Sequence, residues 1–166
     1  NADTLYGDNG NDTFKGDLGA DTIDGGLGLN TVTYAGSGSA VTVNLGTGAG
    51  SGGNAAGDVY LNIQNATGSD AADTLIGDGN ANTLDGGNGD DFIYGGTDQD
   101  TLYGDNGNDC IHGEEGNDLA YGGNGNDALN GQDGDDTLFG EAGVDTIYGG
   151  NGMDALDGGD GSDFLY

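Results

Sequence analysis

The chain has almost no basic residues, no proline, no tryptophan and a single cysteine. Lys15 is its only Lys or Arg, against 30 Asp and Glu, which gives the 166 residues a formal net charge of -29. A protein this acidic repels nucleic acid, anionic lipid and phosphate ligands, so cations are its expected partners. Cys110 has no second cysteine with which to pair, and intramolecular disulfides therefore cannot stabilise the fold.

Long hydrophobic segments are also missing. No run of 18 apolar residues is present, and the N-terminus is not a basic segment followed by an apolar one. We therefore expect no membrane insertion, and any export signal to lie outside these residues. The glycines form no GxxxxGK[ST] phosphate loop, and the absence of proline and of a three-residue period excludes collagen.

What the sequence does contain is a repeat of nine positions, GGxGxDxUx, in which U is a large apolar residue. The sixth position stays in phase through eleven units from residue 73 to residue 163, and four further units begin the chain. Two of the fifteen sixth positions are Asn30 and Asn82. The other thirteen are Asp3, Asp12, Asp21, Asp73, Asp91, Asp100, Asp109, Asp118, Asp127, Asp136, Asp145, Asp154 and Asp163.

The eighth position predicts short strands. It carries Leu, Ile, Val or Phe in every unit except one, where Ala120 stands. The three residues xUx are too few for a helix, and side chains alternate between the two faces of a strand. We therefore expect U to point inward and its two neighbours to point outward.

The glycine-rich positions predict a cation site. Glycine at positions one, two and four permits positive φ, so that successive carbonyl groups can curl toward a common centre. Calcium takes six to eight oxygen ligands from carbonyls and carboxylates, and Asp at position six would complete such a cage. The glycines assigned to these sites are Gly86, Gly89, Gly104, Gly107, Gly113, Gly116, Gly122, Gly125, Gly131, Gly134, Gly140, Gly143, Gly149, Gly152, Gly158 and Gly161.

These units resemble the RTX (hemolysin-type) calcium-binding nonapeptide repeat over residues 1–33 and 73–166. The resemblance implies an all-β fold, a parallel β-roll or β-helix solenoid without helices, in which two nonapeptides make one 18-residue turn. Calcium would then lie between each loop and the equivalent loop one turn later, at about nine sites. The resemblance also implies an extracellular protein, secreted by a type I system or held at the cell surface.

Calcium should be required for folding. One apolar side chain for every nine ordered, glycine-rich residues is a small core to set against the conformational entropy of the chain. Bound cations would supply both free energy and counter-charge, so we expect metal binding and folding to be one event.

Residues 34–72 break the phase of the repeat, because 43 residues separate Asn30 from Asp73. Alternating apolar residues at 41–45 and 59–63 predict wider turns of the same continuous solenoid. The glycine-rich segment 46–57 is expected to be a mobile outward loop. No calcium ligand is assigned within this insert.

Two features should lie on the outer faces. Cys110 and His112 flank inward Ile111, but a thiol and an imidazole on a flat face lack the pocket that a nucleophile needs, so we expect no enzyme here. Aromatic residues recur 18 residues apart at position nine. They are Tyr103, Tyr121 and Phe139 on one face, and Tyr94, His112, Tyr148 and Tyr166 on the other. Such columns suit β-strand packing or a contact surface.

Two function classes stay open at this point. The chain is either a calcium-folded, non-catalytic module of a larger secreted protein, such as an adhesin or exported enzyme, or a self-assembling subunit of an extracellular fibre, matrix or surface layer. In the second class, the partner of the chain is the chain itself.

Overall fold

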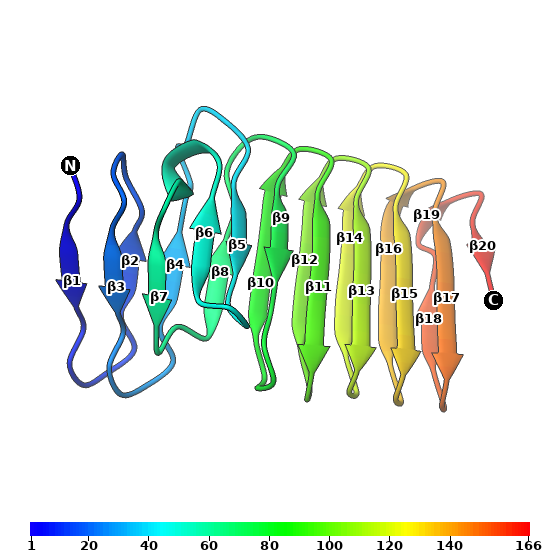
Figure 1. Cartoon of the computed structure of the whole chain (residues 1–166). Coiled ribbons are helices and arrows are strands. Elements are labelled where there is room, and N and C mark those ends of the chain that lie inside the picture. The colour runs from blue at the N-terminus through cyan, green and yellow to red at the C-terminus, as the bar shows by residue number, and fades with distance from the viewer.

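The computed structural model describes residues 1–166 and contains a parallel β-solenoid that advances along one axis from the N-terminus to the C-terminus (Figure 1). The strands are β1 (Thr4–Tyr6), β2 (Thr13–Lys15), β3 (Thr22–Asp24), β4 (Thr31–Thr33), β5 (Thr42–Asn44), β6 (Ala49–Ser51), β7 (Val59–Leu61), β8 (Asn65–Thr67), β9 (Thr74–Ile76), β10 (Thr83–Asn88), β11 (Phe92–Thr97), β12 (Thr101–Asn106), β13 (Cys110–Glu115), β14 (Leu119–Asn124), β15 (Ala128–Asp133), β16 (Thr137–Gly143), β17 (Thr146–Asn151), β18 (Ala155–Asp157), β19 (Asp160–Gly161) and β20 (Phe164–Leu165). The predicted all-β roll is confirmed, and its one helical element is the three-residue 3-10 helix η1 (Gly53–Ala55).

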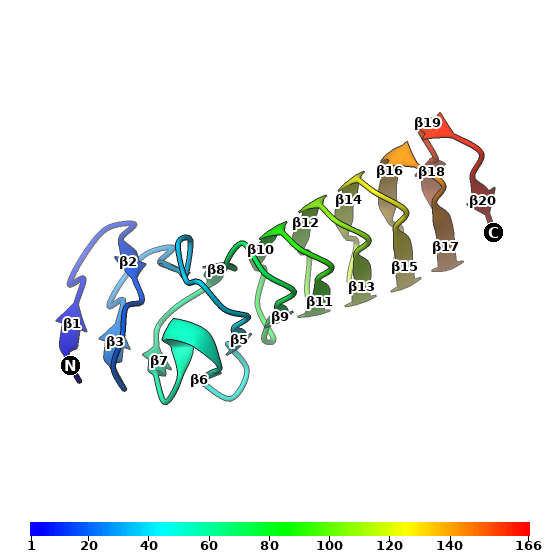
Figure 2. The same cartoon turned by 90° about the horizontal axis from the view of Figure 1, so that it is seen from above.

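The strands form two sheets that face each other across the axis (Figure 2). One sheet has the order β1-β3-β7-β6-β5-β9-β11-β13-β15-β17-β20, and the other has the order β18-β16-β14-β12-β10-β8-β4-β2. In the second block, consecutive strands of one sheet are separated by 18 residues, as in the pairing of Leu102 with Ala120 and of Ala120 with Leu138. Each turn therefore adds one strand to each sheet, as the resemblance to the RTX repeat implies.

The strands of the second block are longer than the expected three residues. Those from β10 to β15 have six residues each, because pairing continues into positions one to three of the loop. Gln132 and Asp133, for example, remain in register with Gly150 and Asn151 one turn later. Stacked loops are therefore joined by main-chain contacts as well as by the contacts of their aspartate side chains.

The core is a narrow column of apolar side chains between the two sheets. In the repeats it consists of the position-eight residues, and even the small Ala120 is buried. Twenty buried side chains make up the column, with Leu5 and Leu156 packed against its ends. No helix of the structure is both long and apolar enough to cross a membrane.

The insert 34–72 continues both sheets. β7 pairs with β3, and β8 pairs with β4 and β10, all in parallel. Between β7 and β9 the first sheet takes in β6 and β5, which introduce the only antiparallel pairings. The segment 46–57 contains β6 and η1 and buries Ala55, and η1 stands out beside β6 and β7 in Figure 2. Its mobility stays a prediction.

Candidate metal centres

The position-six aspartates line up inside the roll, where each loop leads into a strand. From Asp73 to Asp145 their exposed fraction is at most 2%. The Oδ1 atom of Asp127 accepts the main-chain N–H of Asp109, and that of Asp145 accepts the N–H of Asp127, both at 2.8 Å. These N–H groups would otherwise be buried without an acceptor, so the aspartates form a ladder with one hydrogen bond for each turn.

The second carboxylate oxygen of this ladder has no hydrogen-bond partner although it is buried. This holds for Oδ2 of eight position-six residues, namely Asp12, Asp91, Asp100, Asp109, Asp118, Asp127, Asp136 and Asp145. A buried anionic oxygen without a donor or a counter-charge is strongly unfavourable, and each of these atoms therefore points to a bound cation or a proton.

The surroundings of Oδ2 are other oxygen acceptors. A Cβ placed on Gly122 would lie 2.5 Å from Oδ2 of Asp127 and 2.8 Å from the carbonyl oxygen of Gly140 in the next turn. Carboxylate and carbonyl oxygens without a nearby donor suit a hard cation that prefers oxygen ligands, as calcium does. The residues present therefore fit calcium.

The glycines of the loop serve two different purposes. Positive φ occurs at positions two and four, for example at Gly123 (105°) and Gly125 (146°), but position one has ordinary φ throughout. The expectation that position one also needs positive φ is wrong. Glycine is needed there because a Cβ would strike the aspartate and the next turn, whereas position two accepts Glu114 at φ 79°.

Burial changes the acidity of the ladder. Removal from water raises the pKa of Asp91, Asp100 and Asp127 to about 7, and neighbouring carboxylates add to this, although the main-chain N–H bond opposes it. The same cause raises the pKa of Asp109 and Asp118 to about 6. A bound cation would lower all of these values, since it favours the charged form.

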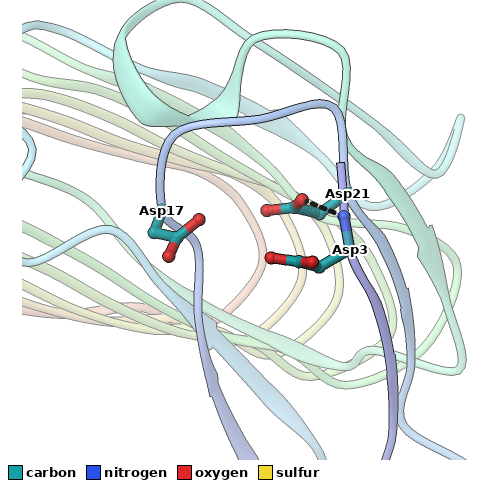
Figure 3. A group of neighbouring side chains, drawn as sticks. All are labelled: Asp3, Asp17 and Asp21. Atoms are coloured by element: carbon teal, nitrogen blue, oxygen red, sulfur yellow. Dashed lines mark hydrogen bonds between the residues drawn. The ribbon is translucent and has the colours of Figure 1, made fainter. Parts of the chain in front are cut away.

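At the first turn the structure brings together three carboxylates, those of Asp3, Asp17 and Asp21 (Figure 3). Their oxygens lie within 4.8 Å of one another, and the N–H of Asp3 donates to Oδ1 of Asp21 at 2.8 Å. Asp3 and Asp17 are exposed, whereas Asp21 is buried. The repeat pattern did not indicate Asp17, because it stands at position two, where the repeat has glycine.

The ends of the ladder and its middle depart from the repeat. Asp154 and Asp163 are partly exposed in the last turn, although both still accept the N–H of the turn before. Asp73 has no free oxygen, because Ser69 donates to it through both its N–H and its hydroxyl, and Val41 through its N–H.

Asp58 is a ladder residue that the sequence reading missed. It is 1% exposed, and its Oδ1 accepts the N–H of Asp21 at 2.8 Å, just as position-six aspartates do elsewhere. The segment Asp58–Leu61 does match DxUx with buried Tyr60 as U, a signal that the loss of phase concealed.

Cys110 and His112 lie together on the outer face of β13, as expected. Sγ is 3.4 Å from Nε2, and the imidazole stacks on Tyr94 with ring centroids 5.1 Å apart. Burial raises the pKa of the Cys110 thiol, which leaves less of the reactive thiolate at neutral pH.

The stacked loops and their buried carboxylates define a solenoid of the metal-binding type. The RTX calcium-binding nonapeptide repeat matches residues 1–32, 67–102, 90–120, 103–138, 121–154 and 130–165. These matches cover well over half of the chain, and the chain belongs to this family. The repeat is a structural calcium-binding unit that binds Ca²⁺ between turns, and it occurs in secreted proteins. No curated protein matched the chain.

The role of glycine at position one can be tested with Gly131→Ala. The new Cβ would lie 2.1 Å from Oδ2 of Asp136 and 2.6 Å from the carbonyl oxygen of Gly149, so adjacent turns must move apart. We expect the free energy of unfolding in calcium to fall by about 1–3 kcal/mol, as in other overpacked sites. The matched control is Gly38→Ala, because a Cβ there has no atom within 4 Å. Equal urea midpoints for the two variants would contradict the steric explanation.

The raised pKa values predict that acid partly replaces calcium. Folding lifts the pKa of Asp91, Asp100 and Asp127 from 3.8 to about 7, so without metal the folded chain binds more protons than the unfolded chain between these pH values. The stability that these three groups contribute to the metal-free roll is therefore fully present below about pH 4 and is lost as the pH rises through 7. Far-UV circular dichroism of calcium-free protein should show more β-structure at pH 5 than at pH 7.5. A loss of β signal on acidification would contradict this.

Proposed function

We propose that the chain is an extracellular β-roll that folds on binding calcium, a non-catalytic module of a larger secreted protein such as an adhesin or an exported enzyme. The observation that carries the proposal is the series of eight buried Oδ2 atoms without a partner, repeated along the inside of the roll. No protein donor satisfies them, and their neighbours are further acceptors.

The ligands would come from two successive turns. Position-six aspartates would supply carboxylate oxygens, and the glycines of positions one and four would supply carbonyl oxygens. Pairs of loops one turn apart give about nine ions. Since each ion carries two positive charges, nine would offset 18 of the 29 net negative charges.

Calcium binding would make folding of the roll depend on whether the chain is inside or outside the cell. Extracellular calcium modules have dissociation constants of roughly 10⁻⁴–10⁻³ M. The low calcium of a cytosol would leave the roll unfolded and thus suited to type I secretion, and the higher calcium outside the cell would complete the fold. Cations fit the charge of the chain as partners, whereas nucleic acid and anionic membranes do not.

The first test compares Asp127→Ala with Asp160→Ala. Asp127 is 2% exposed and belongs to the ladder, so its loss should damage the sites on both sides of it. Asp160 is an exposed position-three residue in β19, where only its carbonyl could contribute. Far-UV circular dichroism of the native chain should show a large gain of β signal when calcium replaces EDTA.

In this titration we expect Asp127→Ala to raise the calcium midpoint roughly tenfold or more, which corresponds to about 1.4 kcal/mol. Asp160→Ala should change it little. Equal shifts for both variants would mean that general acidity, and not ligand geometry, drives binding. A native chain that is equally folded in excess EDTA would overturn the proposal.

Stacked aromatic rings support a second function, self-assembly into an extracellular fibre, matrix or surface layer. Ring centroids are 5.3 Å apart for Tyr103 and Tyr121 and 5.0 Å apart for Tyr121 and Phe139, so these rings form one continuous stripe on one sheet. On the other sheet Tyr148 and Tyr166 stack at 4.7 Å and are 47% and 65% exposed. Tyr103, Tyr121 and Phe139 are half-buried. Apolar stripes that are at least partly exposed favour association once calcium reduces the charge repulsion.

Light scattering with and without calcium tests the second function. The native chain should associate in calcium and stay monomeric in EDTA, because its net charge is then unscreened. A triple variant, Tyr103→Ser, Tyr121→Ser and Phe139→Ser, should associate less. A native chain that stays monomeric at high concentration in calcium rules out assembly, and equal association of both proteins rules out the stripe as the contact.

A further inference from the structure

Tyr34 is an exception to the glycine rule at position one. It follows Gly16 by 18 residues, and the N–H of Gly16 bonds the carbonyl of Thr33, so Tyr34 occupies the place of a position-one glycine in its turn. Its side chain points into the roll and is 0% exposed. A Cβ on Gly16 would lie 2.0 Å from Cε1 of the tyrosine, where most other loops have a carboxylate oxygen of the position-six aspartate.

The hydroxyl of Tyr34 satisfies the ladder residue of the insert. It donates to Oδ2 of Asp58 at 2.5 Å, and the hydroxyl of Tyr60 lies 2.6 Å from the same Tyr34 oxygen. Asp58 and Tyr60 are 1% and 4% exposed. Oδ2 is the atom that lacks a partner in the repeats, so at Asp58 a protein donor stands in the place of a cation or proton.

Neighbouring ladder positions are also satisfied by the protein. The amide of Asn30 donates to the carbonyl of Asn62 at 3.0 Å, and that of Asn82 donates to the carbonyl of Gln64 at 2.7 Å. Both oxygens of Asp73 accept hydrogen bonds from Ser69. None of the ladder residues from Asn30 to Asn82 therefore has the unpartnered buried oxygen found in the repeats.

The same segment has the densest apolar core of the chain. Of the 20 buried core side chains, eight lie within residues 34–66, which is about twice the density of the repeats. They are Tyr34, Val41, Val43, Leu45, Ala55, Tyr60, Ile63 and Ala66. Hydrophobic burial can thus supply here the stabilisation that calcium supplies elsewhere.

We infer that the Tyr34 hydroxyl replaces calcium at Asp58, and that residues 30–82 form a calcium-independent segment of the solenoid. This segment stays folded when calcium is removed and offers the edges of β7 and β4 on one side, and of β9 and β8 on the other, to the calcium-dependent turns. The difference in calcium dependence between this segment and those turns rests on the proposed function.

Hydrogen exchange followed by mass spectrometry of the full chain tests this inference. In EDTA, peptides within 30–82 should exchange at least roughly tenfold more slowly than peptides within 100–163, and calcium should protect the latter. If 30–82 exchanges as fast as 100–163 in EDTA, the segment is not independent of calcium. If calcium fails to protect 100–163, the proposed function fails instead, so the two failures are distinct.

The role of the hydroxyl is tested by Tyr34→Phe, with Tyr121→Phe on the outer stripe as the matched control. Loss of the donor leaves Oδ2 of Asp58 buried and unpaired, which should speed exchange within 30–82 in EDTA by roughly tenfold or more. Tyr121→Phe should leave it unchanged. Equal protection in the two variants would mean that packing alone holds the segment.

A count of bound calcium by native mass spectrometry tests Asp58 directly. In Asp58→Asn, the side-chain oxygen can still accept the N–H of Asp21, and the amide can donate to Tyr34, so the number of bound ions should not change. Asp127→Asn should lose at least one ion. If Asp58→Asn also loses an ion, Asp58 is a calcium ligand and the inference is wrong.

Discussion

The structure depends on a carboxylate that is buried with only half of its hydrogen-bonding capacity used. In the repeats from Asp91 to Asp145, Oδ1 of the position-six aspartate satisfies the main-chain N–H of the turn before, and Oδ2 remains without a donor. The hydrogen bond to Oδ1 fixes the register of the stacked turns, but it places a negatively charged carboxylate inside the roll. A buried Oδ2 without a donor favours a bound cation or a proton, so the contact that aligns the turns also creates the candidate cation sites.

Other features of the repeat follow from this requirement. Position one must be glycine because its Cβ would fill the space beside Oδ2, and positions two and four place the chain in positive φ as the loop turns. Neighbouring loops share the ladder, so the state of one turn affects the next, as in other solenoids. The raised pKa values of Asp91, Asp100 and Asp127 express the same cost in the absence of metal.

The insert meets the same requirement by different chemistry. Asp58 continues the ladder to Asp21, but its second oxygen accepts the hydroxyl of Tyr34, and the second oxygen of Asp73 accepts the main-chain N–H of Ser69. The same segment also has the higher density of buried apolar side chains. The solenoid therefore combines turns in which Oδ2 has no protein donor with turns in which a protein hydroxyl or amide is the donor, on one continuous pair of sheets.

The nine-residue period by itself determined the short strands and their buried position-eight residues. The parallel roll and the 18-residue register, which stacks Tyr103 on Tyr121, came from the resemblance of the repeat to a known family. Only the tertiary structure decided where the insert pairs. Tyr34 lies 24 residues before Asp58, and Asp58 lies 37 residues after Asp21, separations that no period encodes. Their contacts arise because β5 and β6 enter the first sheet and because the apolar side chains of the insert pack between the sheets. Burial of these side chains, and not the spacing of residues in the sequence, therefore decides which residues meet.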